Sequence, residues 1–143
     1  LNYITSRGKW YHMSWKGDST KSGGIATNIG IHFFDMLAWI FGDVEDIQVE
    51  VHHPDHASGF MKLKKARLKW SLSINENHLP ENVRAIGKRT YRSITVNGSE
   101  FEFSEGFTDL HTTSYREILA GKGFGLVDAR KSIEIAQQIR LKV

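Results

Sequence analysis

The chain has 143 residues, no cysteine and a formal net charge of +3 at pH 7. Its apolar fraction of 40% and charged fraction of 24% are ordinary for a soluble globular protein, which excludes wholesale disorder. The lack of cysteine excludes disulfides, thiolate metal sites and cysteine nucleophiles, and it agrees with a cytoplasmic protein. The most apolar stretch, residues 29–41, is too short and too polar to span a bilayer.

The first predicted elements are an extended segment, a loop and a helix. Residues 1–15 are rich in aromatic and β-branched side chains on both sides of Arg7-Gly8, which predicts an extended segment with a turn. Residues 16–24 form a polar, glycine-rich loop. Residues 25–41 carry apolar side chains at helical spacing and predict a helix buried on most sides, with Gly42 as its C-terminal cap.

Strands are predicted for the middle of the chain. Residues 44–51 alternate loosely, and a longer strand lies between Phe60 and Asn75. From Ala66 onward its apolar side chains alternate with polar ones, so one face packs on a core and the other meets water or a partner. Residues 90–96 and 100–103 flank Asn97-Gly98, a type I′ hairpin signal.

Two helices close the chain. One is predicted at residues 109–120, with Thr108 or Asp109 as its cap, and the other begins near Asp128. The second is expected to bury Ala129, Ile133, Ala136 and Ile139. One early helix, a largely antiparallel sheet and returning helices predict an α+β fold of a single domain.

One polar stripe crosses the predicted helix. Asn28, His32 and Asp35 follow each other at i, i+4 and i+7, which places them on one helical face. Two interpretations stay open. The three side chains form a structural network, because buried polar groups are usually satisfied internally. Alternatively, His32 is a catalytic base, because the pKa of an imidazole near neutrality suits proton removal from a hydroxyl.

The segment GGIATNIGIHFFDMLAWIFG resembles the start of the second domain of the Gfo/Idh/MocA oxidoreductases. That family has a Gly-Gly pair, then Asp-x-Gly-x-His, an aspartate and a Trp-x-x-Gly helix end. Asn28 stands where the family has aspartate. The positions that match are Gly30, His32, Asp35, Trp39 and Gly42.

Three further strings are similar to one subgroup, the UDP-N-acetylglucosaminuronate 3-dehydrogenases (the WlbA/WbpB type) of bacterial surface-polysaccharide synthesis. They are YITSRGKWYHMSWKGD, GFTDLHTTSY and GKGFGLVDAR. The resemblance implies an open-faced, mainly antiparallel mixed sheet with helices on one face, as in glucose-fructose oxidoreductase-like enzymes. It also implies that a separate N-terminal Rossmann domain, absent from residues 1–143, binds NAD and supplies a lysine. The isolated chain is then expected to bind no NAD and to be inactive.

The resemblance also implies roles for single residues. Oxidation at C3 of a UDP-sugar uronate needs a base for the hydroxyl proton. By its place in the motif, His32 would be that base or a proton relay, and it would work with the lysine of the absent N-terminal domain. Asn28 would bind the sugar or His32, and Thr27 lies in the same motif. Arg7 suits a carboxylate or pyrophosphate, Lys16 could meet a phosphate, and Tyr11 could stack on uracil or sugar. The plainer alternatives are an exposed arginine, a solvated lysine and a core aromatic.

Two other clusters of residues could have a binding function. His52-His-Pro-Asp-His56 contains zinc-ligand types, but no second ligand cluster is evident, so no metal site is expected. The basic run Lys62–Lys69 is a solvated sheet face or a subunit contact of a homo-oligomer. Nucleic acid is not expected because exposed aromatics are lacking. The run Gly121–Gly125 follows a predicted helix and not a strand, so it is a loop and not a dinucleotide turn.

Three functions compete. The first is the substrate domain of an NAD-dependent dehydrogenase. The second is a non-catalytic oligomerisation or sugar-binding module, and the third is a histidine metal site with unrelated chemistry. Because the sequence opens with Leu1 and not with methionine, we expect a segment to precede it, which favours the first.

Overall fold

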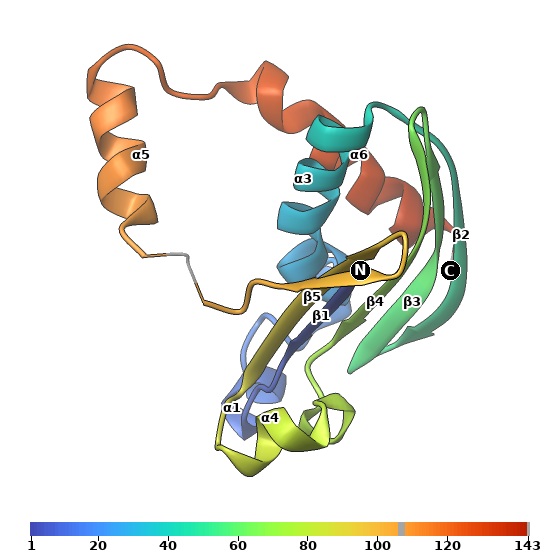
Figure 1. The fold of residues 1–143 in the computed structure, drawn as a ribbon. Coiled ribbons are helices and arrows are strands. Elements are labelled where there is room, and N and C mark those ends of the chain that lie inside the picture. The colour runs from blue at the N-terminus through green and yellow to red at the C-terminus, as the bar shows by residue number, and fades with distance from the viewer. Residues whose placement is uncertain (106–107, 143) are drawn as a thin grey trace.

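A computed structural model of the chain describes residues 1–105 and 108–142. The six strands form one sheet, with α3 and α6 lying along one of its faces (Figure 1). Every helix in the described ranges is too short or too polar to cross a membrane. The elements in chain order are β1 (Asn2–Thr5), α1 (Lys9–Met13), α2 (Ser19–Ser22), the π-helix η1 (Ala26–Gly30), α3 (Ile31–Phe41), β2 (Val44–His53), β3 (His56–Leu63), β4 (Ala66–Ser73), the short 3₁₀-helix η2 (Glu76–His78), α4 (Glu81–Ala85), β5 (Thr90–Val96), β6 (Ser99–Glu102), α5 (Leu110–Leu119) and α6 (Leu126–Leu141).

The sheet is mixed and mainly antiparallel, with the strand order β2-β3-β4-β1-β5-β6. Strand β1 pairs in parallel with β4 and antiparallel with β5, and the remaining neighbours are antiparallel. Tyr3 and Ile4 of β1 are buried in the middle of this sheet. The predicted α+β architecture with an open sheet is confirmed.

Two hairpins show what the strand pattern could and could not predict. Asn97 and Gly98 join β5 to β6 with φ angles of 50° and 86°, as the predicted type I′ turn requires. The single strand predicted between Phe60 and Asn75 is wrong, because Lys64 and Lys65 turn the chain between β3 and β4. The turn contains neither glycine nor proline, so the sequence has neither of the residues that most often mark a turn there.

The predicted extended segment is wrong beyond Thr5. After β1 the chain forms α1, which buries the ring of Tyr11 to 3% exposure. The burial of this ring outweighs the β preference of the aromatic residues around it. The predicted polar loop contains the short helix α2, which begins where Asp18 Oδ1 accepts a hydrogen bond of 3.0 Å from the backbone N–H of Thr20.

The predicted long helix begins as η1 and continues as α3. It ends at Gly42, which has a φ of 85° and donates its N–H to Ala38, so the predicted cap is confirmed. A Cβ on Gly30 would lie 2.7 Å from side-chain atoms of both Leu72 and Phe34, so glycine allows η1 to approach β4 closely. The helix is less enclosed than predicted, because Trp39 is 87% exposed.

Helix α6 covers the sheet beside α3. It begins two residues before the predicted start, and Ala136 and Ile139 are buried as expected. Ile133 is 52% exposed and Ile135 is buried instead, so the predicted apolar face is rotated. Helix α5, which precedes α6 in the chain, has no buried residue and lies away from the sheet (Figure 1).

The beginning of α5 differs from its prediction in one detail. Asp109 occupies the predicted cap position, but its side chain makes no capping hydrogen bond and its φ is 59°. Gly106 and Phe107, which open the GFTDLHTTSY string, lie outside the described residues.

Candidate functional site

Asn28 connects the π-helix to the segment that precedes it. Its side-chain amide donates to the Tyr11 hydroxyl and to the Lys16 carbonyl oxygen, each at 3.2 Å. Within residues 1–105 and 108–142, Asn28, His32 and Asp35 form no hydrogen bond to one another. The structural network considered from sequence is therefore wrong, and Asn28 instead orders two of the predicted binding residues.

Beside this junction lies a hollow of about 200 Å³. Tyr11 and Lys16, both predicted to bind substrate, are part of its wall. Gly17 is also required there, because a Cβ on it would lie 2.6 Å from the His12 Cα atom. Sequence reasoning missed the other lining residues, which are Ser19, Gly24, Ile25, His52, His53 and Pro54.

The hollow contains a neutral phenol close to two cations. Burial raises the pKa of Tyr11, although the hydrogen bond from Asn28 and the charge of Arg7 oppose the rise. The hydroxyl therefore stays protonated at neutral pH and keeps its own proton for a ligand acceptor. Arg7 is exposed, and Lys16 is exposed with its ammonium 5.8 Å from the Trp15 ring centroid. The charge of this region suits an anionic ligand.

The remaining predicted residues lie apart from the hollow. Thr27 donates its hydroxyl to the carbonyl oxygen of Gly23, the residue after α2, at 3.1 Å, so this proton is already used by the backbone. His32 is exposed on α3, does not line the hollow and has no hydrogen-bond partner in the described part of the chain. The structure thus brings Tyr11, Lys16 and Asn28 together and leaves His32 open to solvent.

Two crystal structures of the WlbA (WbpB) dehydrogenase from Thermus thermophilus are similar to this chain. One, in complex with NAD and α-ketoglutarate, is 56% identical with a TM-score of 0.92, and covers 98% of this chain and 45% of that chain. The other, with NAD and UDP-GlcNAcA, is 55% identical over 97% of this chain, with a TM-score of 0.91. The family described as "Oxidoreductase family, C-terminal alpha/beta domain" matches residues 1–69.

The chain belongs to this Gfo/Idh/MocA oxidoreductase family. It spans less than half of the length of either WlbA structure. A dehydrogenase (MviM) from Clostridium difficile shares only the fold, with 11% identity, a TM-score of 0.52, and coverage of 99% of this chain and 54% of that chain. In the structure, Gly30 ends the π-helix η1 and His32 lies in the first turn of α3.

In this member of the family, the run Gly121–Gly125 links α5 to α6. It follows a helix and not a strand, as predicted, so it lacks the strand-to-helix geometry of a dinucleotide turn.

Another hollow, of about 390 Å³, lies across β2, β3 and β4 and is lined by none of the candidate residues. It includes the basic run predicted as a sheet face, whose charges are partly neutralised by β2. Lys62 pairs with Glu45 at 2.6 Å, and Lys69 pairs with Glu50 at 3.5 Å. Phe60 is 42% exposed on these strands. The smaller hollow is the candidate site, because Gly24 of the family segment lines it and Asn28 donates a hydrogen bond to the Tyr11 hydroxyl in its wall.

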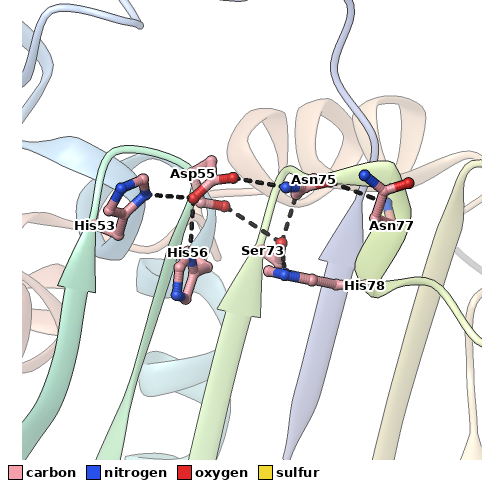
Figure 2. Close-up of polar contacts among 7 residues, drawn as sticks. All are labelled: His53, Asp55, His56, Ser73, Asn75, Asn77 and His78. Carbon is pink, nitrogen blue, oxygen red and sulfur yellow. Dashed lines mark hydrogen bonds and ion pairs between the residues drawn. The ribbon is translucent and has the colours of Figure 1, made fainter.

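A second polar cluster, which sequence reasoning did not assemble, lies at the end of the β2–β3 hairpin (Figure 2). Asp55 lies between His53 and His56, and Asn75 and Ser73 approach it from the end of β4. Hydrogen bonds from His56, Asn75 and His53 hold the pKa of Asp55 well below its usual value. The HHPDH string was visible in the sequence. Its contact with Ser73 and Asn75, about twenty residues later, could not be predicted from the sequence.

Proposed function

We propose that the chain is the C-terminal substrate-binding and oligomerisation domain of an NAD-dependent dehydrogenase. Its substrate would be a UDP-N-acetyl amino sugar uronate oxidised at C3, in the cytoplasm, for bacterial lipopolysaccharide (O-antigen) synthesis. The observation that carries this proposal is the 55% identity, over 97% of the chain, to a dehydrogenase bound to NAD and UDP-GlcNAcA.

The hollow beside Asn28 supports a sugar-nucleotide ligand. Lys16 and Arg7 provide positive charge for pyrophosphate or uronate oxygens. Tyr11 offers a protonated hydroxyl held in place by Asn28. Because Asn28 is fixed by two hydrogen bonds, it acts in the proposal as a positioning residue for this wall.

His32 is the proposed base or proton relay for the C3 hydroxyl. Oxidation would move hydride to the nicotinamide, while the part of this chain is to orient the sugar and accept the proton. An exposed imidazole meets these demands only when another surface covers it, because bulk water would otherwise compete for the same proton.

The covering surface is the proposed N-terminal Rossmann domain, which would hold NAD and add a lysine. Support comes from apolar side chains that this chain leaves uncovered. They are Trp39 on α3, Leu119 on α5, and Phe124 and Leu126 before and at the start of α6, each at least 87% exposed. Single apolar residues on a surface are ordinary, but large side chains that are almost fully exposed on several elements are consistent with a covering partner.

Self-association through the open sheet face is part of the same proposal. The hollow over β2, β3 and β4 combines apolar Phe60 and Leu68 with charged neighbours, as subunit contacts often do. Phe60→Glu should therefore lower the oligomeric mass measured by light scattering, whereas Lys9→Glu on exposed α1 should not. An unchanged oligomeric mass in Phe60→Glu would show that the subunits do not associate through this sheet face.

The enzymatic proposal is tested with the full-length protein by following NADH formation from UDP-GlcNAcA. We expect turnover to fall by about a hundredfold or more in His32→Ala, and to stay near wild type in His111→Ala, which alters an exposed histidine on α5. Near-normal turnover of His32→Ala would remove that residue as the base. Turnover of another sugar nucleotide would change the specificity, and no turnover of any would favour a non-catalytic module.

A further inference from the structure

The end of the β2–β3 hairpin gathers metal-ligating side chains. His53 ends β2 and faces His56 at the start of β3 in the strand register. Asp55 Oδ1 lies 2.6 Å from His53 Nδ1 and 2.7 Å from His56 Nδ1 (Figure 2). One ligand atom from each of these residues lies within 4.8 Å of the other two. Two imidazole nitrogens and a carboxylate oxygen thus converge on one point.

The structure behind Asp55 holds its carboxylate in place. Asn75 donates its side-chain amide to Asp55 Oδ2 at 2.7 Å, which leaves Oδ1 to the histidines. The Asp55 carbonyl oxygen accepts from the Ile74 N–H at 2.9 Å and from the Ser73 hydroxyl at 3.2 Å. Metal ligands in proteins are oriented by second partners of this kind.

A further histidine supports the ring of His56. The His78 ring meets it edge to face, with centroids 5.1 Å apart. The His78 Nδ1 atom also lies 2.8 Å from Ser73 Oγ, the hydroxyl that contacts the Asp55 carbonyl oxygen. His78 is thereby fixed by the same strand end that fixes Asp55.

We propose that His53, Asp55 and His56 bind a divalent transition-metal ion, zinc in the first place. Two histidines and one carboxylate are a ligand set that zinc uses when its fourth position stays open. Ligand atoms around a tetrahedral zinc ion lie about 3.3 Å apart, so the present contacts must open by roughly 0.6 Å. The His53 side chain is 60% exposed, which leaves it free to make this movement.

The proposed ion has a structural consequence for the neighbouring hollow. His53 and Pro54 belong both to this hairpin and to the wall that contains Tyr11 and Lys16. A bound ion would fix the hairpin and add positive charge beside that wall. The metal site does not depend on the proposed dehydrogenase function, because its ligands lie outside the residues given catalytic roles.

The test is metal titration of the tag-free, full-length protein. We expect one Co²⁺ per chain, visible as d–d absorption and displaced by Zn²⁺. His53→Ala and His56→Ala should weaken binding by about a hundredfold or more, and Asn75→Ala by about tenfold. His52→Ala is the matched control, because this neighbouring histidine lies outside the ligand group and should leave binding unchanged.

Circular dichroism of each variant separates loss of ligands from loss of fold. If a variant is unfolded, His53→Gln and His56→Gln, which keep a polar side chain of similar reach, take its place. Absence of Co²⁺ absorption in the wild-type protein would overturn the proposal. Binding that persists in folded His53 and His56 variants would overturn it equally, since the cluster would then be a hydrogen-bonded turn without a metal.

Discussion

Removing the hydroxyl of Tyr11 tests the junction that shapes the candidate site. In Tyr11→Phe, Asn28 loses one acceptor but keeps the Lys16 carbonyl oxygen at 3.2 Å. Loss of one hydrogen bond with its partner still satisfied costs about 0.5–1.5 kcal/mol of unfolding free energy. Tyr11→Ala also removes a ring that is 3% exposed, so it should cost about 3–5 kcal/mol.

Urea unfolding of the wild type and both variants measures these costs, provided that the m-value is unchanged. A double-mutant cycle with Asn28→Ala isolates the contact, because the two effects should then be non-additive by about 0.5–1 kcal/mol. Equal losses in Tyr11→Phe and Tyr11→Ala, or strict additivity with Asn28→Ala, would refute the reasoning that the Asn28 bond orders this wall.

Three other predictions concern elements outside the candidate site. Lys131 and Lys64 lower the pKa of Asp43 from 3.8 to about 2, so their stabilisation is present above pH 4 and is lost as the pH falls toward 2. Asp43→Asn should therefore flatten the dependence of Tm on pH in that window, and an unchanged slope would contradict it. Gly98→Ala should cost about 1–2 kcal/mol in urea unfolding from backbone strain alone, because its φ is 86° and no atom lies within 4 Å of an added Cβ. The amides of α5 should exchange hydrogen rapidly in this chain and slowly in the full-length protein, while those of α6 stay protected in both; slow exchange of α5 in this chain would contradict its isolation.

The fold was predictable where local chemistry and tertiary structure agree. Asn97-Gly98 has the two left-handed residues that a type I′ turn needs, and Gly42 ends α3 for the same steric reason. Prediction failed at Lys64-Lys65 because this two-residue turn has neither glycine nor proline, although the apolar alternation changes phase there, from Met61 and Leu63 to Ala66 and Leu68. It failed at α1 because Tyr11 is buried in the tertiary core and hydrogen-bonded by Asn28, seventeen residues later, which no local propensity contains.

Three residues of the candidate site, Tyr11, Lys16 and Asn28, were named from the sequence, but their arrangement and the other lining residues were not. Helical spacing placed Asn28 and His32 on one face, yet η1 follows a π-helical path and Asn28 turns to Tyr11. The His53–Asp55–His56 cluster shows the opposite case. Its residue types were plain in the sequence, but their orientation comes from Asn75, which the sheet brings close through β3 and β4.

The contrast between Tyr11 and His32 bears on how such a site would be completed. The hydroxyl of Tyr11 is oriented before any ligand arrives, so this wall can bind without further rearrangement. His32 has no hydrogen-bond partner in residues 1–105 and 108–142, so no hydrogen bond from these residues fixes the direction of its ring. A surface that closes over α3 would therefore have to orient the base as well as exclude water. Ligand binding and proton transfer should then be separable: loss of the covering domain would abolish turnover, while the hollow would still bind the sugar nucleotide.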